Sequence, residues 1–265
     1  MTQKNKTPKR NYTGQAKIGI LGYGEVGRAV AKFYGSAGSP QAKIKDLKRD
    51  DGLEGVEILN VCIPWSNNFL KIVQKEIKKI RPELTIIHST IAPGATRKLV
   101  LSLPKGLRMV VHSPVRGIHP YLFEGIKTFV KYIGTDSKKA GKLAKKHLES
   151  LGIKTKVFSP SVTTEIGKIF CTSYYGLCIA WHGEMKRICD KLRVNFEKAV
   201  TDFNKTYNEG YKKLGMENVV RPILYPPKRG IGGHCVLPNT EVLKKYFKSQ
   251  ALNLILKYKK KKYDR

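Results

Sequence analysis

Hydrophobic and polar positions follow two alternating patterns along the first part of the chain. Short apolar runs, typical of buried strands, are separated by segments in which apolar residues recur every three or four positions, as on one face of a helix. The runs predict strands at 16–21, 42–47, 56–63, 84–88, 109–112 and 153–158. The periodic segments predict helices at 28–34, 69–80, 96–103 and 137–151. Because strands that alternate with helices form parallel sheets, the pattern predicts an α/β fold with a Rossmann-type doubly wound parallel sheet.

The remainder of the chain is predicted to be mainly helical. Residues 161–192 are typical of one long helix without proline, and residues 196–214 are typical of another that ends before Gly215. We therefore expect a helical dimerisation or central domain behind the Rossmann-type domain. The expected segments are a flexible basic N-terminus at 1–15, a Rossmann domain at 16–160, the helical central domain at 161–250 and a basic tail at 251–265.

Apolar stretches and cysteines indicate the compartment. No apolar run approaches the ~18–20 residues that a membrane span needs. The polar N-terminus is not followed by a hydrophobic segment, which argues against a secretory signal. The cysteines are odd in number and include no CxxC pair, so we expect neither a disulfide framework nor a metal site. These features predict a cytoplasmic protein.

The charge balance is strongly basic. Lysine and arginine number 51 against 20 acidic residues, which gives a formal net charge of +31. Such an excess attracts polyanions. The lysines recur along the whole chain, however, and no helix-turn-helix, zinc-finger or RNP pattern is present. The charge therefore predicts a general electrostatic bias rather than a specific nucleic-acid module.

A glycine fingerprint lies between the first predicted strand and the first predicted helix. Gly22 allows a tight turn, Gly24 lets the backbone approach a pyrophosphate, and Gly27 allows the helix to pack closely on the strand. Asp46 follows Gly24 by 22 residues, near the ~20 at which a carboxylate binds the adenine ribose. The motif predicts NAD rather than NADP, a preference that the two basic residues after Asp46 weaken. The predicted cofactor-binding residues here are Gly22, Tyr23, Gly24, Glu25, Val26, Gly27 and Asp46.

A second motif places a cysteine after two glycines. Gly232 and Gly233 give a substrate room to approach the backbone, and Cys235 in such a loop can act as a nucleophile. Nearby basic residues would favour its thiolate, namely Lys228, Arg229 and His234. A cysteine is also often a small buried hydrophobe, so the motif alone leaves both interpretations open.

Together these motifs resemble the UDP-glucose/GDP-mannose (nucleotide-sugar) dehydrogenase family over roughly residues 16–245. The matching segments are the fingerprint and residues 89–96, 165–184 and 221–235. The resemblance implies that Cys235 takes the substrate aldehyde as a thiohemiacetal, which a second hydride transfer converts to a thioester. It also implies that Lys168 stabilises developing oxyanions and that Thr90 orders water and cofactor. Further cofactor contacts are implied at Pro64 and Ser89.

Departures from the family pattern limit the expected chemistry. The glutamate that follows Ser-Pro in the family, and that activates water there, is replaced by Val115. An asparagine and an aspartate are replaced by Thr172 and Asn239, respectively. The family's second nucleotide-binding domain has no counterpart, so we expect a shortened form. Other residues could supply the missing base, namely His112, His119 and Glu124.

Three functions are compatible with these motifs. The leading one is a NAD-dependent oxidoreductase that acts on a CH–OH group of a small molecule such as a nucleotide sugar and completes at most one two-electron step efficiently. The alternatives are a two-electron enzyme like the β-hydroxyacid dehydrogenases, and a catalytically silent dinucleotide-binding partner subunit. A homodimer is expected, because the long helix carries more apolar surface than one small domain needs. That surface comprises Tyr174, Tyr175, Leu177, Cys178 and Trp181.

Overall fold

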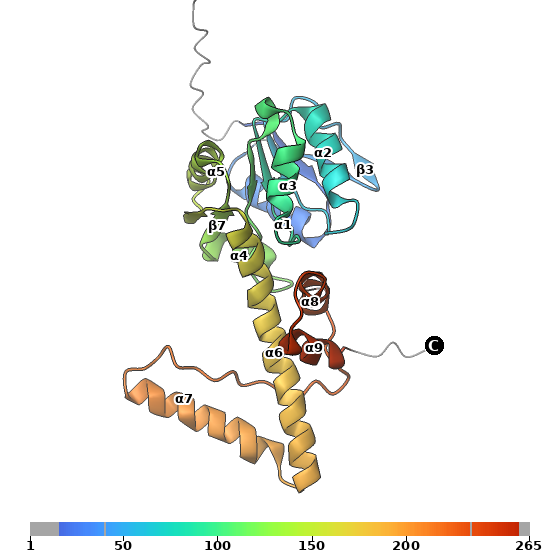
Figure 1. The fold of residues 1–265 in the computed structure, drawn as a ribbon. Coiled ribbons are helices and arrows are strands. Elements are labelled where there is room, and N and C mark those ends of the chain that lie inside the picture. The colour runs from blue at the N-terminus through green and yellow to red at the C-terminus, as the bar shows by residue number, and fades with distance from the viewer. Residues whose placement is uncertain (1–15, 40, 234, 260–265) are drawn as a thin grey trace, which may run out of the picture. The chain divides into compact units, whose positions relative to one another are not determined.

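The structure is a computed structural model and describes residues 16–39, 41–233 and 235–259. The expected flexible N-terminus, the end of the expected basic tail and His234 lie outside the described residues. The chain divides into two compact units, Met1–Lys168 and Ile169–Arg265 (Figure 1). The division falls inside the long helix rather than at its start.

In the described part of the first unit, eight strands form one sheet in the order β3-β2-β1-β4-β5-β6-β7-β8. Neighbouring strands are parallel except for β2 with β3 and β6 with β7, which are antiparallel. This topology confirms the predicted Rossmann-type fold. The strands are β1 (Ile18–Leu21), β2 (Lys43–Asp46), β3 (Arg49–Asp50), β4 (Ile58–Val61), β5 (Leu84–Ile87), β6 (Val110–His112), β7 (Lys131–Gly134) and β8 (Thr155–Phe158).

Helices cover the sheet, and its core lies on both faces. Every residue of β1, β4 and β5 is buried, as expected for parallel strands between helical layers. Successive residues of one strand face opposite sides: Ile58 packs with Phe33 in one cluster, and Leu59 packs with Val73 in the other. The helices of this unit are α1 (Glu25–Ser36), α2 (Phe69–Ile80), α3 (Ala95–Ser102), α4 (Leu122–Thr128) and α5 (Lys138–Ser150), with a 3₁₀ turn η1 (Lys105–Leu107).

The second unit is helical in its described residues. α6 (Val162–Leu192) begins in the first unit and supplies the longest element of the second. The other elements are a π-helical segment η2 (Glu197–Asp202), α7 (Phe203–Lys213), α8 (Val236–Lys244) and α9 (Gln250–Lys257). α7 has no buried residue. No helix in the described part of the chain offers the long apolar stretch that a membrane span requires.

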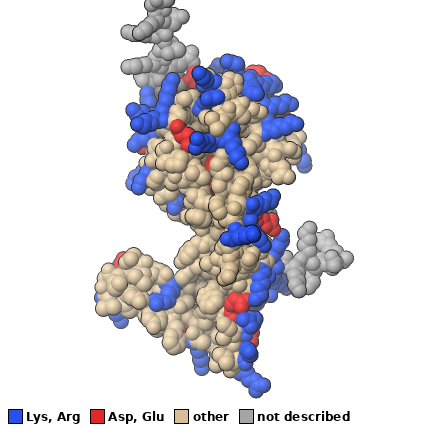
Figure 2. Space-filling view, in the orientation of Figure 1, with Lys and Arg blue, Asp and Glu red and all other residues tan. Residues whose placement is uncertain are grey.

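Several elements differ from the sequence-based expectation. The helix predicted at 196–214 is continuous but starts with a π-helical turn. The sequence pattern does not predict β3, β7, α4, α8 or α9. α9 occupies residues that the sequence pattern assigned to the basic tail, and it buries Leu252 and Ile255. Lys and Arg side chains are scattered over the visible faces of both units, with few acidic side chains among them (Figure 2).

Candidate functional site

The glycine fingerprint forms a turn that side chains would obstruct at two of its three glycines. Gly22 has a positive φ of 96°, and a Cβ there would lie 2.8 Å from the backbone nitrogen of Ile63. A Cβ on Gly27 would lie 2.0 Å from the carbonyl oxygen of Gly22. A Cβ on Gly24 would meet nothing within 4 Å. Because Gly24 is the N-cap of α1, the turn leaves open space directly in front of a helix N-terminus, where an anion is favoured.

Asp46 lies at the end of β2 and is fixed by the fingerprint itself. Its Oδ2 accepts a hydrogen bond from the backbone N–H of Tyr23 at 2.6 Å, and its Oδ1 accepts one from Leu47 at 2.8 Å. The guanidinium of Arg49 is bound by Asp51 through two hydrogen bonds of 2.8 and 2.9 Å. Arg49 is therefore engaged by Asp51, while the Asp46 carboxylate lies beside the turn.

The remaining predicted cofactor residues lie beyond the carboxyl ends of β4 and β5. Pro64 follows β4 and is exposed, whereas Ser89 follows β5 and is buried. The Ser89 hydroxyl donates to the carbonyl of Ile63 at 2.6 Å, which joins the two strand ends. Thr90 is half-buried in the next position. Ligands of open α/β sheets bind outside the carboxyl ends of the strands, where the strand order reverses, and here the order reverses around β1.

A buried lysine binds the backbone of the segment that precedes Val115. Val115 is 5% exposed and packs in the hydrophobic core. The ammonium group of Lys131 donates to the carbonyl oxygens of Ser113 at 2.7 Å and Pro114 at 3.3 Å. Burial lowers the pKa of Lys131 to about 7, with a further contribution from the charge of Lys168. No sequence pattern indicates this role, because a lysine in a short strand is normally exposed.

His112 is not available as the missing base. It is fully buried, and burial lowers its pKa to about 3, so the ring is neutral. Its Nε2 lies 3.1 Å from the carbonyl oxygen of Ser89, which can only accept, so Nε2 carries the proton. Its Nδ1 lies 2.8 Å from the hydroxyl of Thr164, which donates to it. Both ring nitrogens are therefore used within the core.

The other two candidate bases lie at the surface. His119 Nδ1 is 2.8 Å from the Glu25 carboxylate, so the loop that carries His119 contacts the fingerprint. Glu124 is exposed on α4. Two of the three candidates thus contact a predicted cofactor-binding residue, His112 at Ser89 and His119 at Glu25, but only His119 is exposed.

Glu165 connects α6 to the 89–96 segment. Its carboxylate accepts hydrogen bonds from the backbone N–H groups of Gly94 at 2.5 Å and Thr96 at 2.8 Å, at the start of α3. Lys168 lies one turn further along α6 and is half-buried. Its charge contributes to the lowered pKa values of Lys131 and His112, which places it among these basic groups. Sequence reasoning missed the role of Glu165, which depends on a contact between distant segments.

Cys235 belongs to the second unit, where it is half-buried and forms the N-cap of α8. The residue after it, Val236, packs against Gly176 of α6, where a Cβ would lie only 2.4 Å from the valine side chain. Asn239 and Thr172, which replace the family's aspartate and asparagine, contact each other. The side-chain Nδ2 of Asn239 donates to the hydroxyl oxygen of Thr172 at 3.0 Å, and this hydroxyl donates to the carbonyl of Ile169. The two substituted positions therefore form one contact between α6 and α8.

The cysteines form no disulfide, and all five are described. Among the described residues there is no group of three or more His, Cys, Asp or Glu side chains that could hold a metal ion.

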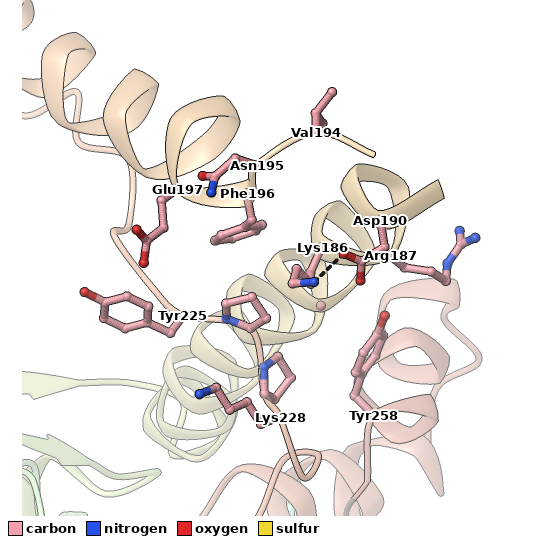
Figure 3. A pocket seen from close by; sticks show the side chains of 13 residues that line it. Lys186, Arg187, Asp190, Val194, Asn195, Phe196, Glu197, Tyr225, Lys228 and Tyr258 are labelled. Carbon is pink, nitrogen blue, oxygen red and sulfur yellow. Dashed lines mark hydrogen bonds and ion pairs between the residues drawn. The ribbon is translucent and has the colours of Figure 1, made fainter. Parts of the chain in front are cut away.

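A groove of about 1160 Å³ lies elsewhere in the second unit, between the end of α6 and residues 225–228 (Figure 3). It is lined by Lys186, Asp190 and Tyr258, among others, and Figure 3 shows the Lys186–Asp190 ion pair on its wall. Eleven residues of helix, or about 17 Å, separate Thr172 from the groove residue Gly183. The groove contains none of the predicted site residues.

Two curated proteins similar to this chain are named as the same kind of enzyme. A UDP-N-acetyl-D-mannosamine dehydrogenase of Methanococcus maripaludis strain C7 is 28% identical over 207 residues, which are 72% of this chain and 45% of that protein. The corresponding enzyme of Pyrococcus horikoshii is 28% identical over 211 residues, 73% of this chain and 47% of that protein. The chain thus spans about half the length of the curated relatives that it matches. No family model matches the chain.

Solved structures share the fold. The UDP-D-ManNAc dehydrogenase of P. horikoshii superposes with a TM-score of 0.73 at 22% identity, covering 91% of this chain and 68% of that one. The 3-hydroxyisobutyrate dehydrogenase of Mycobacterium tuberculosis superposes with a TM-score of 0.65 at 12% identity, covering 92% of both chains. With the curated relatives, these findings confirm the resemblance to the nucleotide-sugar dehydrogenase family.

Proposed function

We propose that this chain is a NAD-dependent oxidoreductase that acts on a CH–OH group, in the manner of the nucleotide-sugar 6-dehydrogenases. The observation that carries the proposal is the fingerprint turn, which is closed to side chains at Gly22 and Gly27 and open at Gly24 in front of α1. These residues fit a dinucleotide, because backbone amides and the helix dipole favour a pyrophosphate there. The similarity to UDP-N-acetyl-D-mannosamine dehydrogenases supports a nucleotide sugar as the small-molecule substrate.

We infer NAD rather than NADP from Asp46. Its carboxylate is held by two backbone amides, so it cannot easily turn away from a 2′-phosphate, and Arg49 is already bound by Asp51. Calorimetric titration with each dinucleotide tests this inference. Equal affinity for NAD and NADP would show that Asp46 does not select the cofactor.

The proposed roles divide between the two units. Bound NAD would accept hydride from the substrate carbon while the hydroxyl proton passes to water, which leaves an aldehyde. The Lys168 ammonium would stabilise the oxyanion, and Thr90 would order water and cofactor. The Cys235 thiolate would then attack the aldehyde carbon, forming a C–S bond while the carbonyl oxygen takes up a proton, which gives a thiohemiacetal. We assign cofactor binding to residues 16–160 and the cysteine loop to 161–250.

We expect the proposed chemistry to stop early because Val115 occupies the position of the family's glutamate. Valine neither accepts a proton nor binds water, and Val115 packs in the core. Loss of one general base typically costs ~10²–10⁴ in rate. We therefore expect one efficient two-electron step or a covalent intermediate held at Cys235. Mass spectrometry after incubation with NAD and substrate should detect that adduct, whereas rapid turnover to a free acid with two NADH per substrate would overturn this limit.

The decisive experiment is to incubate the protein with NAD and a panel of UDP-sugars and hydroxyacids while following NADH absorbance. We expect NADH with a UDP-sugar, loss of turnover in Lys168→Met, and loss of the covalent adduct in Cys235→Ser. Binding of NAD without NADH from any substrate would instead indicate the silent partner subunit.

A second candidate is a two-electron enzyme of the β-hydroxyacid type. It is favoured by the 3-hydroxyisobutyrate dehydrogenase structure, which this chain matches over 92% of its length. The two candidate functions differ in whether the reaction requires the Cys235 thiol. Oxidation of a hydroxyacid that persists in Cys235→Ser but not in Lys168→Met would favour the second.

We also propose a homodimer formed through α6. Large apolar side chains at Phe170, Tyr174, Trp181, Ile188 and Leu192 are exposed at intervals of four and seven residues, so they lie on one face of the helix. Such a stripe is typical of a helix–helix interface. Cysteines without disulfides are consistent with a reducing compartment, and we place the protein in the cytoplasm.

A further inference from the structure

The last residue of α9 and the two residues after it are anchored to α6 by a single buried carboxylate. Glu184 is 8% exposed and accepts four hydrogen bonds. Its Oε1 accepts from the Lys257 ammonium and the Tyr258 hydroxyl, each at 2.8 Å. Its Oε2 accepts from the Nη2 and Nε atoms of Arg187 at 2.9 and 3.1 Å. We call residues 257–259 the carboxyl-terminal clasp.

The tyrosine ring of the clasp lies directly on the helix backbone. A Cβ on Gly183 would come within 2.3 Å of the Tyr258 ring, so only glycine permits this contact. The absence of a side chain at Gly183 therefore lets the Tyr258 hydroxyl reach the carboxylate of the next residue. Three positively polarised groups around Glu184 lower its pKa to about 2, with the Lys257 ammonium as the largest cause. The anchor is thus fully ionised at neutral pH.

The same clasp holds the segment that leads to the candidate nucleophile. The backbone N–H of Ile231 donates to the carbonyl oxygen of Tyr258 at 2.6 Å, and Ile231 pairs with Lys259 as an isolated parallel bridge. Ile231 is buried and lies four residues before Cys235. At the outer edge, Lys259 pairs with Glu241 of α8 at 2.6 Å, and both side chains are about half exposed.

We propose that Glu184 and Tyr258 are positioning residues for the Cys235 thiol: the carboxylate fixes the clasp on α6, and the clasp fixes the start of the cysteine loop through Ile231. The inference rests on the proposed function for its catalytic meaning, because it assigns a role in presenting the nucleophile. Its structural part, that the thiol's accessibility depends on Glu184, is independent of any substrate.

The test is the rate at which iodoacetamide alkylates Cys235, measured by peptide mapping in the full chain. In Glu184→Ala we expect Cys235 to react roughly fivefold to tenfold faster, because loss of hydrogen bonds to a charged group frees the loop. Cys171, exposed on α6, is the internal control and should react at its original rate. Glu184→Gln should restore much of the protection, since its amide oxygen can still accept from Tyr258.

A matched variant removes the exposed pair on the same clasp. Glu241→Gln should change the Cys235 rate by less than about twofold, because exposed ion pairs contribute little. If Glu184→Ala does not fold, Tyr258→Phe serves instead: it deletes one hydroxyl and keeps the ring on Gly183. Unchanged protection of Cys235 in a folded variant, or an equal acceleration at Cys171, would overturn the proposal.

Turnover provides a second readout that separates the two claims. If the proposed function holds, Glu184→Ala should lower kcat while leaving the KM for NAD unchanged, since the cofactor residues lie in the other unit. If the wild-type protein forms no NADH, the proposed function fails, but the alkylation rates still decide whether the clasp positions Cys235.

Discussion

The two units are stabilised in different ways. In the described part of the first unit, most large apolar side chains are buried between a sheet and its helices, and even its polar groups, such as His112 and Lys131, are drawn into the core. In the second unit, the exposed large hydrophobic side chains outnumber the buried ones, and charged contacts such as those of Glu184 hold the segments together. In the described residues, the first unit buries most of its own large apolar side chains, whereas the second leaves many of them exposed, which is why we propose a partner surface there.

Glycine substitutions in the fingerprint should produce the largest effect and should separate fold from binding. Gly27→Val places a side chain 2.0 Å from the Gly22 carbonyl and should destabilise the first unit by more than about 3 kcal/mol. Gly24→Asn fills open space and retains a favoured N-cap residue, so it should keep the stability and abolish NAD binding. Thermal unfolding and calorimetry measure the two properties. Equal loss of stability in both variants would contradict this account of the turn.

Acid should weaken the first unit before the second. Burial lowers the pKa of His112 to about 3 and that of His147 to about 4, from 6.5 in the unfolded chain. Each of these histidines is neutral in the folded chain but takes up a proton in the unfolded chain below pH 6.5. The fold is therefore most stable above pH 6.5 and loses free energy of unfolding as the pH falls. Between pH 6.5 and 4.5 the first unit should lose about 2 kcal/mol or more for each histidine. The ion pairs of Glu184 should persist until the pH falls from about 4.5 towards 2.

The two tryptophans allow this prediction to be measured unit by unit. Trp65 packs on Phe69 in the first unit, and Trp181 lies on α6 in the second. Urea unfolding followed by fluorescence in Trp181→Phe reports the first unit, and in Trp65→Phe it reports the second. Acid transitions that coincide in the two variants would show that the units do not differ in this way.

The exposed stripe of α6 should account for a smaller but specific effect on association. Trp181→Glu introduces a charge into the proposed dimer interface, where an aromatic anchor typically contributes ~2 kcal/mol or more. Sedimentation should show a shift from dimer to monomer at micromolar concentration. Leu101→Glu, at an exposed leucine of the first unit, is the control and should leave the dimer intact. A wild-type protein that sediments only as a monomer would contradict the dimer itself.

The contrast between the units also explains what could be predicted from the sequence. α2 was predicted to the residue, because a regular apolar periodicity ends before Pro82. β7 was missed because a four-residue strand that starts with Lys131 carries no strand signal, and its lysine is buried only through contacts with Ser113 and Pro114. α9 was missed because the lysines that follow it obscure its two buried residues.

At the site, local motifs were predictable and long-range partners were not. The fingerprint and Asp46 depend on spacing along the chain, which sequence reports directly. The capping of α3 by Glu165 joins residues 69 or more positions apart, and no periodicity encodes it. For the same reason Thr172 and Asn239 were interpreted as two separate losses, although they form one hydrogen bond across 67 positions.

That hydrogen bond should give the smallest of the predicted effects, and a double-mutant cycle can isolate it. Asn239 is buried, and the Thr172 hydroxyl accepts a hydrogen bond from its Nδ2 while donating to the Ile169 carbonyl, so each single variant removes this bond from the side chain that remains. Thr172→Val and Asn239→Leu should each cost about 1–2 kcal/mol in the unfolding free energy of the second unit. Because both remove the same contact, the double variant should be less destabilised than the sum, with a coupling of about 1 kcal/mol. Additive losses, measured through Trp181 fluorescence, would mean that the two side chains do not stabilise the contact between α6 and α8 as one pair.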